Sequence, residues 1–482
     1  MAAHMEDGSL PLDALQAWPQ ASALEAERLL RAALRAGSGK IIVLDDDPTG
    51  VQTVHGVDVY THWDQAAIDE GFRGQRRLFY ILTNSRALLP RQTEELHRDI
   101  ALKVLDASRR LGRDFLLISR SDSTLRGHYP LETEALRQAL EEAGGLRFDG
   151  EIICPFFMEG GRYTLGDVHY VKEGDRLVPA AQTEFARDAA FGYTHSDLKQ
   201  WVEEKTGGRF SAKEVISIPL EDLRALRVDA VADRLARAEN FQKIIVNAAS
   251  YEDLKVFAAA FARARARGKR YLLRTAAALP RVLGGVKDKP LLSAKELASR
   301  TGHGGLIIVG SHVQKSTAQL QHLLASFPEL AALEFKAAAA LQDGGLEAET
   351  ARVRDAAREA IRRGQTAVVY TSRGLLTVPG SGEESLRLSV RIADALTGVV
   401  SDLTVRPAFL VAKGGITSSD IGVKGLNVRK ARVLGQAAPG VPVWRTDSGS
   451  KFGRMPYVIF PGNVGGEDSL TRVVAACLGK EP

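Results

Sequence analysis

The sequence predicts an α/β protein made of two α/β domains with mostly parallel sheets. Short apolar runs, such as residues 41–44 and 306–309, have the length and composition of buried strands. Amphipathic segments of helical period, such as residues 93–111, alternate with these runs, which is typical of βαβ units. At 482 residues the chain is too long for one ordinary core, so at least two domains are expected.

The first half of the chain supplies most of the predicted strands. An apolar run that stops at a glycine, a proline or a polar cluster marks each of them. The predicted strands cover residues 41–44, 57–60, 78–82, 115–118, 151–154, 243–247 and 270–274. The predicted helices cover residues 12–36, 93–111, 130–143 and 251–267. Residues 167–179 are predicted to form a hairpin that turns at Gly174.

The alternation restarts after residues 284–305, a segment of weak periodicity that contains glycine, lysine and proline. The strands predicted beyond it cover residues 306–309, 367–370, 409–412 and 457–460, and the helices cover residues 316–326, 347–363, 384–396 and 467–478. We therefore expect an N-terminal helical extension at residues 1–38, a first α/β domain at 39–290 and a second at 300–482. The active site is expected in the cleft between the two α/β domains.

The composition limits the classes of function. No apolar run approaches the roughly 18 residues of a membrane span, so no membrane partner is expected. The net charge of +5 is spread along the chain, and its densest basic cluster, residues 263–270, closes a predicted helix, so no nucleic-acid partner is expected. The first residues lack the apolar centre of a signal peptide, and Cys154 and Cys477 are the only cysteines. These features predict a cytoplasmic protein.

Three carboxylates follow the first predicted strand. Asp45, Asp46 and Asp47 come directly after residues 41–44, and a Pro-Thr-Gly sequence then forces a tight loop. Open α/β sheets bind their ligands at the carboxyl ends of strands. Like charges this close destabilise one another unless a metal, a cation or backbone amides compensate them. This strand end is therefore the first candidate for a functional site.

Two further polar clusters also follow predicted strands. One contains Asp122, Ser123, Thr124 and Arg126, and the other is a glycine-rich turn that ends in Arg162. The planar guanidinium group of Arg126 offers a fork of donors that suits a carboxylate. Together the clusters predict a polar crevice that accepts an anionic small molecule.

Glycine-rich turns follow three predicted strands in the second half of the chain. They contain Gly310 with Ser311, residues 414–417, and Gly462. Glycines let backbone N–H groups approach a phosphate, and helix N-termini favour anions. The first turn is not a Walker A motif, because no glycine precedes Lys315. We interpret the three turns as a nucleotide-binding site.

An acidic half that binds hydroxyl groups and a second half that binds phosphates predict a small-molecule kinase. Phosphoryl transfer needs Mg²⁺ to neutralise the phosphates and a carboxylate to accept the proton of the attacking hydroxyl group. Either Asp46 or Asp47 is expected to be that base, while the other carboxylate orients the hydroxyl groups of the substrate. The residues themselves leave this choice open.

Two other functions compete with the kinase. Asp45, Asp47 and Thr49 have the spacing of the opening motif of haloacid-dehalogenase-like phosphatases, in which the first Asp is the nucleophile and the second the acid/base. This alternative is weaker, because it leaves the later polar clusters and the glycine turns without a role. A non-enzymatic regulator that binds a sugar acid is the third alternative, but no pair of DNA-binding helices is visible.

The same motifs resemble those of the four-carbon acid sugar kinase family, once catalogued as a domain of unknown function. The family's Asp-Asp-x-Thr-Gly motif matches residues 46–50, and its Asp-Ser-Thr-x-Arg-Gly motif matches residues 122–127. Four further motifs match residues 155–162, 310–311, 414–417 and 462–465. The resemblance spans residues 40–478, although Asp45 and residues 51–55 depart from the pattern of the family.

The resemblance implies an ATP-dependent kinase that phosphorylates a hydroxyl group of a small sugar acid, such as threonate, erythronate or 3-oxo-tetronate. The first domain would bind the acid, and the second would bind ATP with Mg²⁺. The implied substrate-binding residues are Asp122, Ser123, Thr124, Arg126 and Arg162, and the implied nucleotide-binding residues are Ser311, Gly414, Gly415, Ile416, Thr417 and Gly462. No residue is assigned as a metal ligand, and a homodimer is an open expectation.

Overall fold

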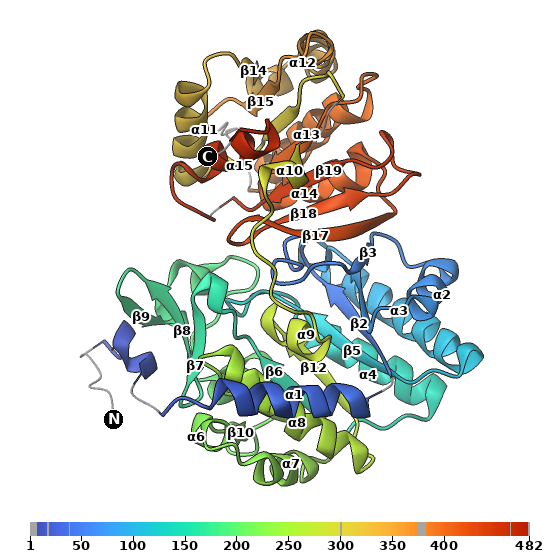
Figure 1. Cartoon of the computed structure of the whole chain (residues 1–482), viewed down its shortest axis with the longest axis vertical. Helices are drawn as coiled ribbons and strands as arrows, with labels where there is room; N and C mark the ends of the chain where they lie inside the picture. The colour runs from blue at the N-terminus through green and yellow to red at the C-terminus, as the bar shows by residue number, and fades with distance from the viewer. Residues whose placement is uncertain are drawn as a thin grey trace. The chain divides into compact units, whose positions relative to one another are not determined.

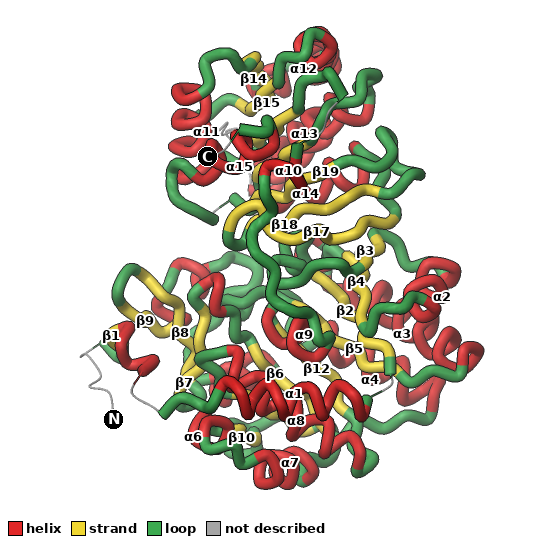
Figure 2. Tube along the Cα trace, in the orientation of Figure 1, coloured by secondary structure: helices red, strands yellow, loops and turns green. Residues whose placement is uncertain are grey.

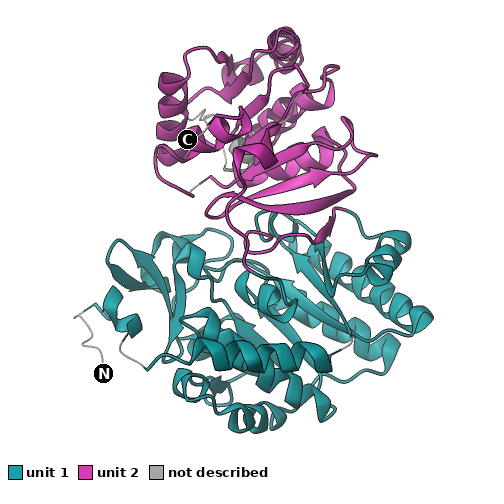
Figure 3. Cartoon of the chain, in the orientation of Figure 1, with its two compact units in different colours: residues 1–50, 62–287 teal, residues 51–61, 288–482 magenta. Residues whose placement is uncertain are grey.

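The computed structural model describes residues 7–16, 19–37, 39–298, 301–374, 382–462 and 464–480. Residues 17–18 of a predicted helix, 299–300 of the predicted boundary segment and Asn463 of the last glycine turn lie outside the described residues. The chain forms two compact units, the first comprising residues 1–50 and 62–287 and the second residues 51–61 and 288–482 (Figure 3). Each unit is an α/β structure on a mostly parallel sheet, which confirms the predicted fold class (Figure 1).

The first unit is built on a fully parallel sheet with the strand order β10-β11-β6-β12-β5-β2-β4. The strands are β2 (Lys40–Asp45), β4 (Leu78–Leu82), β5 (Phe115–Arg120), β6 (Gly150–Cys154), β10 (Ile216–Ile218), β11 (Gln242–Val246) and β12 (Tyr271–Thr275). The central strands β2 and β5 are buried along their whole length, as expected of a sheet covered on both faces. Because the strands are parallel, their carboxyl ends meet at one edge of the sheet.

Helices of the first unit cover this sheet (Figure 2), and four of them overlap the helices predicted over residues 12–36, 93–111, 130–143 and 251–267. They are α1 (Ala23–Ala36), α2 (Gln65–Arg73), α3 (Pro90–Leu111), α4 (Leu131–Gly144), α5 (Leu198–Lys205), α6 (Leu220–Arg224), α7 (Val228–Ala236), α8 (Tyr251–Ala266) and α9 (Ala278–Leu283). Helix α3 packs against α4, and α8 packs against both α1 and α7.

The helix predicted at residues 12–36 is wrong over its first part. Leu12–Gln16 form a short 3-10 helix, and α1 begins only after Ser22. Pro19 lies between the two and disfavours a continuous helix, because it lacks a backbone N–H group. The side chain of Ser22 then accepts a hydrogen bond from the backbone N–H of Glu25, which is the usual way to start a helix.

A small antiparallel sheet also belongs to the first unit. Its order is β1-β9-β8-β7, with β1 (Leu10–Pro11), β7 (Arg162–Leu165), β8 (Val168–Glu173) and β9 (Arg176–Pro179). Strands β8 and β9 form the hairpin predicted over residues 167–179, and Gly174 lies in its turn with a φ of 62°. Since β7 begins at Arg162, this sheet positions one of the predicted anion-binding residues.

The second unit has the strand order β3-β17-β18-β19-β16-β13-β15-β14. The strands are β3 (Asp58–Tyr60), β13 (Leu306–Val309), β14 (Ala331–Phe335), β15 (Ala367–Thr371), β16 (Leu410–Lys413), β17 (Lys430–Ala438), β18 (Val441–Thr446) and β19 (Pro456–Phe460). Those from β19 to β14 in this order are parallel, whereas β3, β17 and β18 pair antiparallel. Strand β3 therefore belongs to the second unit, although the sequence places it within the first domain at residues 39–290.

Strands β14, β17 and β18 were not predicted from the sequence. Buried and half-buried residues alternate along most of β17, Phe335 is the one buried residue of β14, and Pro442 lies within β18, so each of these strands carries a weak local signal. The helices of the second unit are α10 (Ala294–Leu297), α11 (Gln314–Ser326), α12 (Gly345–Arg362), α13 (Gly382–Ser401), α14 (Gly415–Asp420) and α15 (Ser469–Cys477). In the described part of the chain, every helix is too short or too polar to cross a membrane.

Candidate active site

Two arginines compensate the three carboxylates at the end of β2. Arg86 follows β4, and its Nε and Nη2 donate to the two carboxylate oxygens of Asp46 at 3.1 and 2.7 Å. Nη1 of Arg120, the last residue of β5, lies 3.1 Å from Oδ1 of Asp45 and 3.4 Å from Oδ1 of Asp46. Cations thus provide the compensation that the sequence requires, and both arginines come from the strands that flank β2.

Burial and the arginine charges separate the pKa values of the three carboxyl groups. Burial raises the pKa of Asp45 to about 8 against the opposing charge of Arg120, and it also raises the pKa of Asp46. For Asp47, burial is outweighed by the two arginines and by hydrogen bonds from Thr49, so its pKa is lowered. The Asp47 side chain is 19% exposed, against 2% for each of the other two. Asp47 is therefore the carboxylate of the three that is both ionised and accessible.

The cluster that follows β5 adjoins this acidic strand end. Nη1 of Arg86 lies 3.6 Å from Oδ2 of Asp47 and 3.9 Å from Oδ1 of Asp122. Asp122 accepts hydrogen bonds from Nε of Arg126 at 2.8 Å and from the hydroxyl group of Thr124. Although burial opposes the shift, the two arginine charges hold the pKa of Asp122 well below its usual range. One guanidinium group thus links the two clusters that the sequence predicts.

Arg126 and Arg162 meet over one aromatic ring. Their guanidinium carbons lie 5.1 and 5.4 Å from the centroid of the Phe185 ring. The buried Nε of Arg162 has no hydrogen-bond partner among the described residues. Burial and the charge of Arg126 lower the pKa of Arg162, although Asp122 opposes the shift. This half-buried pair of cations has hydrogen-bonding capacity to spare and suits an anionic ligand.

The two hydroxyl residues of the second cluster are buried and hold the loop in place. The hydroxyl group of Thr124 donates to Asp122. The backbone carbonyl oxygen of Thr124 accepts a hydrogen bond from the Tyr193 hydroxyl at 2.9 Å. The carbonyl oxygen of Ser123 lies 2.8 Å from Nε2 of His169. Of the predicted substrate-binding residues, Asp122, Arg126 and Arg162 are therefore the ones that present charge at this site.

Sequence reasoning passed over Arg86 and Arg120. Both follow or end predicted strands, at residues 78–82 and 115–118, and three adjacent carboxylates called for nearby cations. The missing information was the strand order, which places β4 and β5 on either side of β2. Glu132 of α4 was also missed. Its carboxylate accepts hydrogen bonds from three serine hydroxyls, and one of these serines directly precedes Arg86.

The second unit contains a cavity of about 320 Å³ at the carboxyl ends of its parallel strands. All six predicted nucleotide-binding residues line this cavity, and they are Ser311, Gly414, Gly415, Ile416, Thr417 and Gly462. Apolar side chains complete the lining, among them Leu388, Ile392 and Leu396 of α13 and Ala337. The cavity thus combines a glycine-rich edge with an apolar wall, which suits the phosphates and the base of a nucleotide.

A close side-chain contact explains Gly310, and a backbone conformation explains Gly414. A Cβ atom at Gly310 would collide with the hydroxyl group of Thr417. Gly414 has a φ of 121°, a conformation that L side chains rarely adopt. Ser316 of α11 joins the turns, because its hydroxyl group donates to the carbonyl oxygen of Gly462 at 2.9 Å and also bonds the Ser311 hydroxyl. The three turns therefore form one interlocked edge.

Sequence reasoning also left Lys413 and Arg373 without a role. Nζ of Lys413, at the end of β16, donates to the carbonyl oxygens of Pro461 at 3.0 Å and Gly462 at 3.3 Å. Burial lowers the pKa of Lys413 to about 7. Arg373 donates to the carbonyl oxygen of Ser311 at 2.8 Å. A lone lysine at the end of an apolar strand was the available signal for the first of these residues.

The residues present also decide how a magnesium ion could be held. In the part of the chain that the structure describes, no group of three or more His, Cys, Asp or Glu side chains could hold a metal ion. Arg86 and Arg120 already neutralise the acidic strand end. Mg²⁺ commonly binds through one or two carboxylates together with the phosphates of its substrate. The arrangement therefore fits a cation that enters with a nucleotide.

Two family models match this chain, one in each half. A model described as a sugar-binding N-terminal domain matches residues 41–283, and a model described as a nucleotide-binding C-terminal domain matches residues 306–470. The chain therefore combines a sugar-binding with a nucleotide-binding domain. It belongs to the four-carbon acid sugar kinase family, which the ordered motifs predicted.

Solved structures support the fold. A Salmonella typhimurium LT2 protein, provisionally named a tRNA synthase, superposes with a TM-score of 0.65 at 16% identity, over 90% of this chain and 98% of that one. A Haemophilus influenzae protein of the DUF1537 family superposes with a TM-score of 0.58 at 17% identity, over 90% of this chain and 99% of that one. At such low identities these likenesses concern the fold alone. The search of curated proteins found no match.

Proposed function

We propose that the protein is an ATP-dependent kinase that phosphorylates a hydroxyl group of a small sugar acid. A four-carbon acid such as threonate, erythronate or 3-oxo-tetronate is the expected substrate. The observation that carries the proposal is the juxtaposition, within a sugar-binding domain, of the ionised carboxylate of Asp47 and the cationic pair Arg126 and Arg162. A sugar acid offers a hydroxyl group for the first and a carboxylate for the second.

Arg126 and Arg162 are proposed to bind the carboxylate of the substrate. Arg126 already donates through Nε to Asp122, which leaves its terminal nitrogens for a ligand and for the longer contact of 3.6 Å to Asp188. Arg162 has an unsatisfied Nε, and its burial makes a charge-assisted hydrogen bond stronger than one in water. Asp122 is proposed to orient both the arginine fork and the hydroxyl groups of the acid.

Asp47 is proposed as the base, and Asp46 as a positioning residue. Both oxygens of Asp46 are occupied by Arg86, and the side chain is buried. Oδ1 of Asp47 accepts from Thr49, whereas its Oδ2 has only the longer contact of 3.6 Å to Arg86. Asp47 can therefore accept a hydrogen bond from the attacking hydroxyl group. A modest base suffices, because phosphoryl transfer depends mainly on positioning and charge neutralisation.

The cavity of the second unit is proposed to bind ATP. The backbone around Ser311, residues 414–417 and Gly462 would hold the phosphates, and the apolar wall from α13 would hold the base. Mg²⁺ would enter with the phosphates and neutralise part of their charge. Lys413 would support this edge through the carbonyl groups it fixes. For transfer, the acceptor hydroxyl group and the terminal phosphate of ATP must then come together.

The structure favours this proposal over the phosphatase alternative. A haloacid-dehalogenase-like mechanism needs an ionised, accessible nucleophile at Asp45. The Asp45 side chain is 2% exposed and paired with Arg120, and burial raises its pKa to about 8. Gly50 packs so closely that a Cβ atom there would collide with the Asp45 carboxylate. A phosphate group could not reach it without rearrangement of the loop.

The first experiment is ADP release by the full chain with Mg-ATP and a panel of four- to six-carbon sugar acids. ADP release that depends on the acid is expected, and the matched neutral polyol, threitol for threonate, should be a much poorer acceptor. Phosphate release from phosphorylated sugar acids without ATP would instead favour the phosphatase. If neither activity appeared, the kinase proposal for four- to six-carbon acids would be overturned.

We also propose a cytoplasmic location, where ATP is available and the buried thiols of Cys154 and Cys477 stay reduced. A homodimer stays an expectation, and light scattering coupled to size-exclusion chromatography would test it. A mass equal to twice that of the chain is the expected outcome.

A further inference from the structure

The first unit contains a second cavity, of about 330 Å³, far from the acidic strand end. It lies between α1, α8 and α9 and reaches Ile41 and Leu116, near the starts of β2 and β5. Asp45 lies four residues further along β2, which corresponds to about 13 Å of strand. The cavity is therefore at the opposite edge of the sheet from the proposed sugar-acid site and has no part in it.

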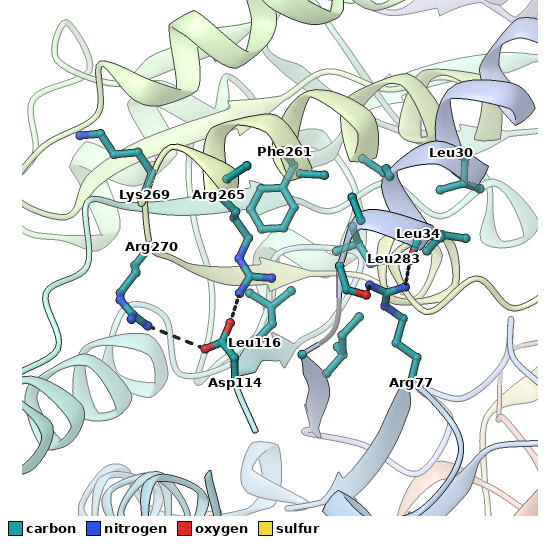
Figure 4. A pocket seen from close by; sticks show the side chains of 18 of the residues that line it. Leu30, Leu34, Arg77, Asp114, Leu116, Phe261, Arg265, Lys269, Arg270 and Leu283 are labelled. Atoms are coloured by element: carbon teal, nitrogen blue, oxygen red, sulfur yellow. Dashed lines mark hydrogen bonds and ion pairs between the residues drawn. The ribbon is translucent and has the colours of Figure 1, made fainter. Parts of the chain in front are cut away.

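Apolar side chains form the walls of this cavity (Figure 4). Leu30 and Leu34 come from α1, Phe261 comes from α8 and Leu283 comes from α9. Figure 4 shows Leu116 of β5 at the same cavity. An apolar hollow of this size is at the lower end of the range of about 300–1,000 Å³ in which small ligands bind.

Positive charge dominates the rim. Four cationic side chains line the cavity, those of Arg77, Arg265, Lys269 and Arg270. The single carboxylate among the lining residues is that of Asp114. Asp114 is shared, because its carboxylate accepts from Arg265 at 2.8 Å and faces Arg270 at 4.0 Å. Lys269 has a partner outside the lining in Asp149, at 2.9 Å. The cations at the rim thus outnumber the anions that face them.

Arg77 is the least compensated of these cations. Its Nη1 and Nη2 donate to the backbone carbonyl oxygens of Leu34 and Gly37, each at 2.6 Å, so neutral groups hold it in place. Burial and the nearby charge of Arg265 lower the pKa of Arg77. The guanidinium groups of Arg77 and Arg265 therefore repel one another at the cavity. An anion placed between them would relieve that repulsion.

We propose that this cavity binds a small amphipathic carboxylate, whose apolar body packs among Leu30, Leu34 and Phe261 and whose carboxylate faces Arg77 and Arg265. The apolar walls disfavour sugars and nucleotides, which would lose hydrogen bonds to water there. The cationic rim disfavours neutral or basic apolar molecules relative to an acid of the same shape. The site is independent of the proposed kinase activity.

The test uses isothermal titration calorimetry on the full chain with three probes. Octanoate carries both features, 1-octanol has the same chain length without the charge, and acetate has the carboxylate without the chain. One-to-one binding of octanoate is expected, at least about tenfold tighter than binding of either control. Arg126→Ala should leave octanoate binding unchanged, because Arg126 belongs to the other proposed carboxylate site.

Two cavity variants assign the binding to this place. Arg265→Gln should weaken octanoate about tenfold while leaving octanol unchanged, since it removes the charge and retains a polar side chain that can donate hydrogen bonds. Ala33→Phe places a ring into the cavity from a half-buried position of α1 and should abolish binding of both probes. Circular dichroism and the melting temperature check that Ala33→Phe folds, and if it does not, the Arg265→Gln comparison decides alone.

Three results would overturn the proposal. Octanoate could fail to bind at millimolar concentration, or octanol could bind as tightly as octanoate. Octanoate binding could also be lost in Arg126→Ala while Arg265→Gln retains it, which would place the ligand at the sugar-acid site.

Discussion

The candidate sugar-acid site and the candidate nucleotide site are built from different kinds of groups. At the end of β2 the site consists of charged side chains, with Arg86 and Arg120 balancing Asp45, Asp46 and Asp47. In the second unit the site consists of glycine turns and apolar side chains, and the buried Lys413 and half-buried Arg373 donate hydrogen bonds to backbone carbonyl groups of the turns. We therefore expect the first site to recognise its ligand through charged side chains, and the second to do so through the space that the glycine backbone leaves open.

This contrast has consequences for how the two sites respond to substitution. Removing a side chain from the first site should delete an interaction and affect the sugar acid alone. Adding a side chain to the second site should fill space and affect the nucleotide alone. Variants with the opposite effects would contradict this contrast between the two sites.

The largest effect is expected from Asp47→Asn. The substitution keeps the shape of the side chain and removes the proton acceptor, so kcat should fall by about 10²–10⁴-fold while the affinity for ATP is unchanged. Because the pKa of Asp47 is lowered, wild-type kcat should persist with falling pH until the pH is below the ordinary range of Asp. Steady-state kinetics and a pH profile measure both, and a wild-type kcat in Asp47→Asn would refute its role as the base.

Asp45→Asn is the matched control for that variant. Burial raises the pKa of Asp45 to about 8, so the carboxyl group is mostly protonated at neutral pH and an amide replaces it closely. We expect kcat within about tenfold of the wild type. A loss as large as that of Asp47→Asn would revive the phosphatase mechanism, in which Asp45 is the nucleophile.

The next effect concerns the glycine edge. In Gly310→Ala the new methyl group would collide with Thr417, so KM for ATP should rise about tenfold to a hundredfold while KM for the sugar acid stays the same. Gly374→Ala is the matched control, since Gly374 lines the same cavity and a Cβ atom there meets nothing within 4 Å. Equal effects of the two variants would show that the edge is not a close-packed phosphate site.

Arg126→Ala should act on the other substrate. Loss of a charge-assisted hydrogen bond to the carboxylate should raise KM for the acid about tenfold to a hundredfold and leave KM for ATP unchanged. The exposed Arg187 directly precedes Asp188, which lies 3.6 Å from Arg126, and Arg187→Ala controls for a general loss of positive charge. If KM for the acid did not change in Arg126→Ala, the carboxylate would have to bind elsewhere.

The sequence predicts some residues of these sites and misses others. It places Asp46, Asp47 and the glycine turns correctly at strand ends, because apolar runs and turn residues are local signals. It does not reveal Arg86 and Arg120 as partners of the acids, because their proximity depends on the order β5-β2-β4. Strand order is set by long-range pairing and is absent from any local pattern.

The same reason explains the strands that were missed. Strands β17 and β18 are stabilised by pairing with each other and with their neighbours, whereas buried and half-buried residues alternate in β17 and a proline, Pro442, lies within β18. Context decides such strands more than propensity does. Helix α1 is the opposite case. Ser22 offered a local signal for the start of the helix, but the prediction, which covers residues 12–36, begins before it.

The smallest effect is expected from Lys413, whose titration should make the folding stability depend on pH. Burial lowers the pKa of Lys413 from 10.5 to about 7, so between these values the unfolded chain binds more protons than the folded one. Folding stability therefore rises with pH in this window, by up to about 1.4 kcal/mol per pH unit from this group, and the gain is lost as pH falls through 7.

Lys413→Met removes the titrating group and keeps an unbranched side chain at the end of β16. Urea unfolding of both proteins at pH 7, 8 and 9 isolates the contribution of Lys413, because the other groups titrate alike in the two and cancel in the difference. The wild type should gain stability relative to the variant as pH rises. Parallel curves would mean that Lys413 keeps its charge, and a charged lysine beside the glycine edge would then contribute to phosphate binding directly rather than through the carbonyl groups of Pro461 and Gly462.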